Sequence, residues 1–315
     1  DPSIAALSVE KLGRNDGVLA VIGPALSESV SEVAPVATRM RIPVITPSAL
    51  APDIARLSPY LFRNSITPAQ EIEQLVDYSM RKLGLVTFSI LYPLNARGMD
   101  MRDSFKNRVE EIGGLLLYSF FFHPDDTDFG EHLKRMGGME DEDLPLGPVD
   151  GTELSIHLPP LEYQAIFLAG DAASASLIAP ALHYYNMNSL TLLGSSLWHS
   201  DKLLAWGGSY LEGSVFVDGF FAESPWPQVA EFVAGFKKAF GEEPDILSAQ
   251  AYDAASIILD LIESGVRERE AMRDAMLRVE EYPGVSGYTT IQPTGESKKE
   301  LFVLTVKEGK LVQIN

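Results

Sequence analysis

The sequence of 315 residues contains no cysteine. Disulfide bonds, thiolate metal sites and cysteine nucleophiles are therefore excluded. The cellular compartment is not decided by this absence, because a large exported protein can fold without disulfides.

Basic residues are scarce. Lysine and arginine number 25 against 44 aspartates and glutamates, which gives a net charge of −19. This balance argues against non-specific binding to nucleic acid and against docking on anionic lipid, since both need a basic face. Four of the acids are consecutive at 140–143, and we expect a solvated loop there rather than a metal site.

Long apolar runs are also missing. No stretch reaches the roughly 18 residues that span a bilayer, and no signal peptide is visible. The sequence opens with Asp1 rather than methionine, so we expect a mature or trimmed chain. A lipid anchor would then belong to a segment preceding Asp1.

Catalytic and metal-binding motifs are absent as well. The five histidines are scattered at 123, 132, 157, 183 and 199, without the spacing of a metal site. No nucleophile elbow, phosphate-binding loop or dinucleotide fingerprint occurs. We therefore expect no cofactor, no metal and no enzymatic activity.

What the sequence does contain is a regular alternation of apolar strands and amphipathic helices. Strands are predicted at 18–22, 44–46, 86–92, 115–122, 165–169, 190–193 and 214–217. Helices are predicted at 3–13, 29–40, 69–83, 98–112, 129–136 and 172–185, followed by three in succession at 225–240, 247–264 and 268–280. A terminal hairpin is predicted at 301–314. This order is typical of an α/β fold with parallel sheets.

Small polar residues follow several of these strands, at the edge where open α/β sheets bind ligands. After the first strand, Ser27 or Ser29 is expected to cap the next helix, and Glu32 would complete a capping box with Ser29. Alternatively, the serine hydroxyl and the backbone N–H groups at the helix N-terminus form an anion-binding site. The spacing alone does not choose between the two. Ser48 and Ala49 follow the second strand and would face the same crevice.

Two further strand ends carry candidate ligand contacts. Asp171 either accepts a ligand ammonium or caps the helix that begins near 172, and the pattern favours the cap. Trp198 follows the serine pair 195–196 and either packs in the core or stacks on a ligand. Tyr252, within a predicted helix, is expected to pack, with its ring or hydroxyl as an alternative cleft contact.

These residues carry a resemblance to a known family. The sequence resembles the leucine/isoleucine/valine-binding branch of type I periplasmic binding proteins over nearly its whole length. The similar segments are 17–24, 42–49, 210–214, 232–241, 249–255 and 286–289. Segments 165–171, 177–180 and 192–196 are also similar to the penicillin-binding-protein activator lipoproteins, which share the fold and are thought to regulate peptidoglycan synthesis by contacting a synthase.

The resemblance implies two Rossmann-like, three-layer lobes with parallel central sheets and a ligand cleft that closes by a hinge. We expect lobe one at 1–66 and 224–285, lobe two at 67–223 and 286–315, and an acidic surface insertion at 137–160. The strand, helix and strand that usually open the fold are not recognisable in this sequence.

The resemblance also implies the contacts of the ligand. The carboxylate-binding serine of the family falls on Ser27, beside Ala25, and the second small-residue loop falls on Ser48 and Ala49. Three positions depart from the family pattern: Leu50 replaces a hydroxyl residue, Arg97 replaces an aromatic, and Ser196 stands where an acid usually pairs with the ligand ammonium.

The function implied is that of an extracytoplasmic receptor for a small, amino-acid-like solute, working in the periplasm with the membrane permease of an ABC importer or with a sensor. The alternative is a regulator whose partner is a cell-wall synthase.

Overall fold

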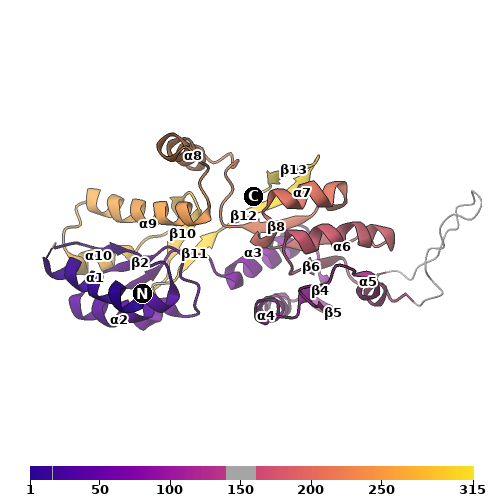
Figure 1. Ribbon diagram of the computed structural model, residues 1–315, viewed down its shortest axis with the longest axis horizontal. Helices are drawn as coiled ribbons and strands as arrows, with labels where there is room; N and C mark the ends of the chain where they lie inside the picture. The colour runs from indigo at the N-terminus through magenta and orange to yellow at the C-terminus, as the bar shows by residue number, and fades with distance from the viewer. Residues whose placement is uncertain (16, 140–160) are drawn as a thin grey trace, which may run out of the picture. The chain divides into compact units, whose positions relative to one another are not determined.

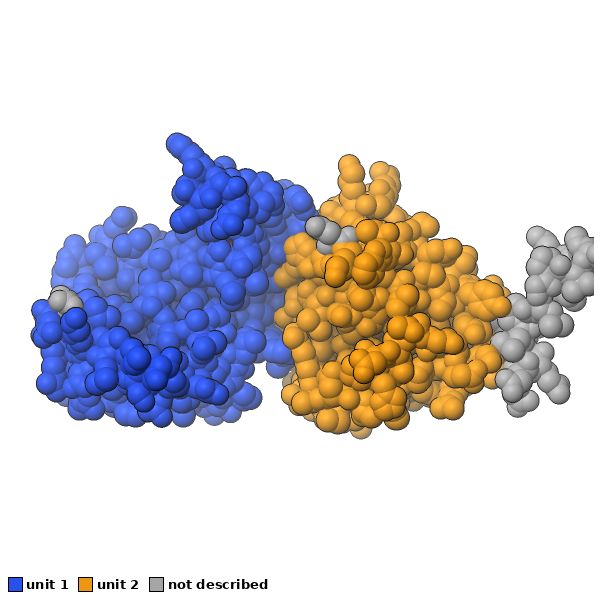
Figure 2. Space-filling model, in the orientation of Figure 1, with its two compact units in different colours: residues 1–70, 219–302 blue, residues 71–218, 303–315 orange. Residues whose placement is uncertain are grey.

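A computed structural model describes residues 1–15, 17–139 and 161–315. The acidic run at 140–143 and most of the insertion expected at 137–160 lie outside these residues. The chain divides into two compact units, and Figure 2 colours them separately. Unit 1 comprises 1–70 and 219–302, and unit 2 comprises 71–218 and 303–315, so the chain passes between the units three times.

Unit 1 contains a small parallel sheet in the order β1-β2-β3, formed by β1 (Val21–Ile22), β2 (Val44–Thr46) and β3 (Leu61–Arg63). Its helices are α1 (Pro2–Asn15), α2 (Ser27–Met40), α8 (Pro227–Phe240), α9 (Ile246–Glu263) and α10 (Arg269–Met276). Figure 1 shows α1 and α2 beside one another below β2. Apolar side chains of α2 and of β2, including Val30, Val33 and Val44, are fully buried.

Unit 1 also contains an antiparallel sheet that sequence patterns did not predict. It is formed by β9 (Tyr282–Gly284), β10 (Gly287–Ile291) and β11 (Ser297–Glu300) in the order β11-β10-β9. The expectation that 286–302 belongs to the second lobe is therefore wrong. Pairing with β9 holds this segment in unit 1, and Lys299 of β11 meets Asp253 of α9 with 3.7 Å between the ammonium and a carboxylate oxygen.

Unit 2 is built on a seven-stranded sheet in the order β13-β12-β8-β7-β6-β4-β5. The five strands β4 (Thr87–Pro93), β5 (Leu115–Phe122), β6 (Ala165–Leu168), β7 (Thr191–Gly194) and β8 (Val215–Asp218) pair in parallel. The terminal hairpin of β12 (Phe302–Lys307) and β13 (Lys310–Gln313) extends the sheet.

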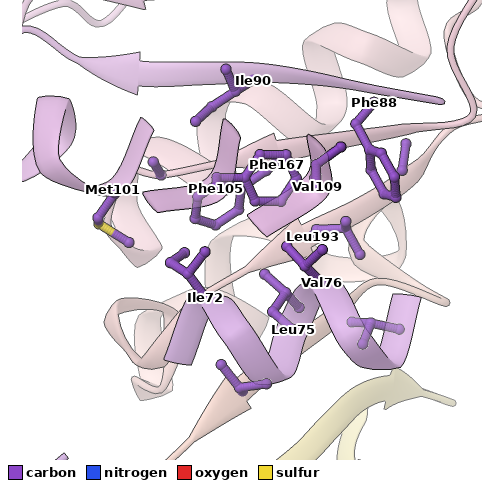
Figure 3. Packing of buried hydrophobic residues seen from close by; sticks show 14 of the residues in the cluster. Ile72, Leu75, Val76, Phe88, Ile90, Met101, Phe105, Val109, Phe167 and Leu193 are labelled. Atoms are coloured by element: carbon purple, nitrogen blue, oxygen red, sulfur yellow. The ribbon is translucent and has the colours of Figure 1, made fainter. Parts of the chain in front are cut away.

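The helices of unit 2 are α3 (Pro68–Arg81), α4 (Ala96–Glu111), α5 (Gly130–Met136), α6 (Ala172–Tyr184) and α7 (Asp201–Gly207), with short 3₁₀ turns η3 (Ser196–Trp198) and η4 (Gly208–Leu211). Figure 3 shows α3 and α4 packing against the sheet. Phe105 of α4 stacks on Phe167 of β6 with 4.7 Å between the ring centres. The expected α/β class with largely parallel sheets is confirmed.

Candidate functional site

In unit 1, the loops that follow β1 and β2 are joined by hydrogen bonds. The Ser48 hydroxyl donates to the carbonyl of Ala25 over 2.9 Å, and the Thr46 hydroxyl donates to the carbonyl of Pro24 over 2.7 Å. Parallel strands end at the same edge of a sheet, which is why residues more than twenty positions apart meet here. Three of the predicted residues, Ala25, Ser27 and Ser48, therefore belong to one cluster of loops.

Ser27 is the residue of this cluster best placed to contact a ligand. It begins α2, and its hydroxyl oxygen accepts hydrogen bonds from the backbone N–H groups of Leu50 (3.2 Å) and Ala51 (3.1 Å). Since both lone pairs are occupied, the hydroxyl can act only as a donor toward anything else. Among the described residues its own proton has no acceptor, so it is available to an external anion.

The capping interpretation for this helix start is wrong. The N-cap residue is Leu26, whose side chain accepts no hydrogen bond, and Ser29 is buried at 7% exposure rather than poised at a cap. Among the described residues, no side chain accepts from the first N–H groups of α2, so these groups keep their affinity for an anion.

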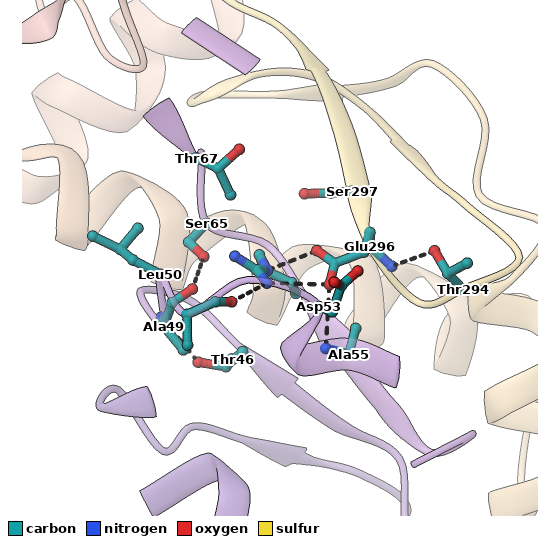
Figure 4. Close-up of polar contacts among 12 residues, drawn as sticks. Thr46, Ala49, Leu50, Asp53, Ala55, Ser65, Thr67, Thr294, Glu296 and Ser297 are labelled. Atoms are coloured by element: carbon teal, nitrogen blue, oxygen red, sulfur yellow. Dashed lines mark hydrogen bonds and ion pairs between the residues drawn. The ribbon is translucent and has the colours of Figure 1, made fainter. Parts of the chain in front are cut away.

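An ion pair between the buried Arg63 and the partly exposed Glu296 fixes the loop that Ser27 contacts. Figure 4 shows Ser65 donating to the carbonyl of Ala49, and Glu296 in the centre of a polar network. The guanidinium of Arg63, 1% exposed, lies 2.7 Å from Glu296 and donates to the carbonyl of Ala51 over 2.6 Å. The side chain of Ala49 is itself buried, so this predicted residue offers only its backbone.

Tyr252 lies on α9 with 48% of its surface exposed. Its ring packs against Phe232 of α8 with 4.7 Å between ring centres. The packing that the sequence predicts is present, and contact with a ligand stays a prediction.

In unit 2, a cavity of about 230 Å³ lies at the carboxyl ends of β4, β5 and β6. Its lining includes two of the predicted residues, Arg97 and Asp171, together with Asn95, Phe122, Ser174 and Leu197. Asp171 follows β6, one of the strand ends expected to carry a ligand contact, whereas Arg97 was expected only from the family resemblance.

Arg97 and Asp171 give this cavity one cation and one anion. Arg97 is exposed in the first turn of α4 and, within the described part of the chain, forms no ion pair. Its planar fork of N–H donors suits a carboxylate. Asp171 caps α6, because one carboxylate oxygen accepts from the backbone N–H (2.9 Å) and the hydroxyl (2.8 Å) of Ser174.

Ser196 contacts an acid, Glu71, that the sequence analysis did not identify as a candidate. The Ser196 hydroxyl donates to the carboxyl of Glu71 over 2.8 Å, so a carboxyl group does meet the loop where the family pattern places one. Burial raises the pKa of Glu71 to about 7, and the nearby carboxylate of Asp218 acts in the same direction. Glu71 occupies the first turn of α3, where an acid is ordinary, so no local pattern marked it.

For Trp198 the packing alternative is confirmed and the stacking alternative is wrong. Its ring is fully buried and packs on Phe216 with 6.0 Å between ring centres, so it presents no face to a ligand. Gly194 makes this possible, because a Cβ at that position would lie only 2.3 Å from the indole. The tryptophan closes the core beneath the Ser196 loop.

Elsewhere in the described part of the chain, no group of three histidines, aspartates or glutamates is arranged to hold a metal ion. His199 pairs with Asp218 at the end of β8, and His157 lies outside the described residues. No helix of the described segments is both long enough and apolar enough to cross a membrane.

Comparison with known proteins matches residues 1–310 to a family described as periplasmic binding protein. A curated relative, Leu/Ile/Val-binding protein homolog 3 from Brucella melitensis, is 22% identical over 94% of this chain and 75% of its own.

Two solved structures show the same fold over 100% of this chain. One, from Rhodospirillum rubrum, carries the provisional description of a branched-chain amino acid ABC transporter, with 26% identity, a TM-score of 0.86 and 85% of its own chain covered. The other is a solute-binding protein of an ABC transporter from Rhodopseudomonas palustris in complex with 3,4-dihydroxybenzoic acid, with 22% identity, a TM-score of 0.64 and 82% covered.

Proposed function

Since the chain belongs to the family of periplasmic binding proteins, we propose that it is a solute-binding protein that captures a small, amino-acid-like carboxylate outside the cytoplasm for the permease of an ABC importer. It performs no chemistry on that solute. Its residues act by hydrogen bonding and charge pairing alone.

The observation that carries this proposal is the state of the Ser27 hydroxyl. Two backbone N–H groups fill its lone pairs, and its proton is left for an acceptor at the uncapped start of α2. A donor hydroxyl beside free N–H groups at a helix N-terminus suits a carboxylate. In unit 2, the exposed guanidinium of Arg97, which forms no ion pair with another described residue, is a second group that prefers a carboxylate.

The relatives' names support a carboxylate as the common feature of the ligand. One relative is named for leucine, isoleucine and valine, and one structural neighbour holds an aromatic acid. The side chain of the solute is a separate question. Asp171 is an exposed acid in the unit 2 cavity and favours a ligand that also carries an ammonium group.

A thermal-shift screen of the purified chain tests the proposal. The panel contains the common amino acids and hydroxybenzoic acids, each beside its amide or alcohol, which lacks the carboxylate. A ligand at 100 times its dissociation constant raises the free energy of unfolding by about 2.7 kcal/mol. No shift with any carboxylate of the panel would overturn the proposal, and capture of a cell-wall synthase in that case would favour the regulator.

Substitutions then test the binding mode by titration calorimetry. We expect Ser27→Ala to weaken binding by about tenfold or more, since one hydrogen bond to a charged group is lost. Ser31→Ala is the matched control, because this exposed serine one turn later donates only to the carbonyl of Ser27. Arg97→Gln should weaken binding similarly, while Lys106→Gln on the same helix should not. Unchanged affinity in both S27A and R97Q contradicts the assignment of the donors.

A further inference from the structure

Unit 2 contains a second, larger cavity at the other end of its sheet. Its volume is about 470 Å³, and it lies where β7 and β8 begin, at Thr191 and just before Val215. The cavity that Arg97 lines lies at the carboxyl ends of the strands, whereas this cavity lies at their amino ends. The length of the strands therefore separates the two cavities. The end of α6, the segment 187–192, the turn η4 and residues 212–213 supply the remaining wall.

The charge of the lining is negative. Glu212 contributes a carboxylate, and no lysine or arginine is among the lining residues. The carboxylate is fixed by the turn between β12 and β13, accepting from the N–H groups of Glu308 (2.6 Å) and Gly309 (3.4 Å). A carboxylate has about four acceptor positions, so it can still receive a cation, whereas an anionic ligand would be repelled.

Aromatic rings form another part of the wall. Tyr210 of η4 and His183 of α6 pack with 5.3 Å between ring centres, and Tyr210 is 48% exposed. An exposed aromatic face attracts an organic cation. Buried Ala179, Leu182 and Leu192 supply an apolar surface for a short hydrocarbon stem.

We propose that this cavity is a second ligand site that binds a small organic ammonium compound. The cationic group contacts Glu212 and the ring of Tyr210, and the short hydrocarbon part lies on the apolar wall. This ligand differs in charge from the carboxylate proposed above, and its binding does not depend on that proposal.

The test uses the full chain and choline as the probe, with saturation-transfer NMR and calorimetry as readouts. The matched comparison is the neutral alcohol in which carbon replaces the ammonium nitrogen of choline. We expect saturable choline binding, and at least about tenfold weaker binding of the alcohol, because the attraction to the carboxylate and the ring is lost.

Variants locate the site. Glu212→Gln removes the charge and keeps one acceptor oxygen for the turn, which can serve the N–H of Glu308. Tyr210→Leu removes an exposed ring. Each should weaken choline binding several-fold with the melting temperature retained, while Asp171→Asn in the other cavity should leave it unchanged. No saturable choline binding, equal binding of the alcohol, or unchanged binding in both E212Q and Y210L would overturn the proposal.

Discussion

Glu71 is an acid buried in the first turn of α3, and its titration is a property of that single residue. Burial raises its pKa from 4.5 to about 7. Between these values the folded chain holds a proton that the unfolded chain has released, so stability falls as the pH rises from 4.5 to about 7. Above pH 7 the folded state bears the full free-energy cost of holding an ionised carboxylate at this buried position.

Replacement of Glu71 by glutamine should therefore stabilise the protein at alkaline pH. The carbonyl of the amide can still accept from Ser196, and the shift corresponds to about 3 kcal/mol at pH 8, with little effect at pH 4.5. Urea unfolding of E71Q and the parent at both pH values measures this. Glu110→Gln, at an exposed acid, is the control, and an equal effect of the two substitutions at pH 8 would refute the explanation.

At the scale of elements, one carboxylate attaches α9 to the antiparallel sheet of unit 1. Asp253 is 1% exposed and accepts from the backbone N–H groups of Val285 (2.7 Å) and Ser286 (2.9 Å), between β9 and β10. The Lys299 ammonium lies 3.7 Å away and donates to Ser286 and Thr289. Burial lowers the pKa of Lys299 to about 8, and Asp253 opposes that change.

Asp253→Ala should therefore destabilise unit 1 strongly, because it leaves a buried ammonium without its counter-ion and two buried N–H groups without their acceptor. We expect a loss of about 3–5 kcal/mol in urea unfolding, with faster hydrogen exchange in β9, β10 and β11. Asp260→Ala is the matched control, since Asp260 joins the same helix to the same sheet through the Tyr282 hydroxyl at the surface. Similar losses in D253A and D260A would contradict the role assigned to burial.

The elements also show what the sequence could predict. Apolar periodicity is local, so β2 and β5 occur at the predicted residues and α2, α4 and α6 within a few residues. The β9–β11 sheet was missed because its stability comes from long-range contacts such as that between Lys299 and Asp253.

The same distinction applies to the site. Strand ends could be located from the sequence, so the pairing of Ser48 with Ala25 followed from topology. The partners of side chains depend on three-dimensional packing. Nothing local indicated that Glu71 lies against Ser196, or that Leu26 rather than a serine precedes α2 as its cap.

The whole molecule carries a net charge of −19, and this excess opposes the compact state through self-repulsion. Salt weakens that repulsion, because the screening length falls from about 30 Å at 0.01 M to about 10 Å at 0.1 M. We therefore expect the melting temperature at pH 8 to rise with sodium chloride over this range and to level off above it.

The pH provides the control for this prediction. Near the isoelectric point of about 4.6 the net charge vanishes, so the same additions of salt should change the melting temperature little. Scanning calorimetry at the two pH values separates self-repulsion from a general effect of salt on hydration, which acts at both. A rise of equal size at both pH values, or a fall at pH 8, would show that local ion pairs such as Arg63–Glu296 outweigh the excess negative charge in setting the salt response.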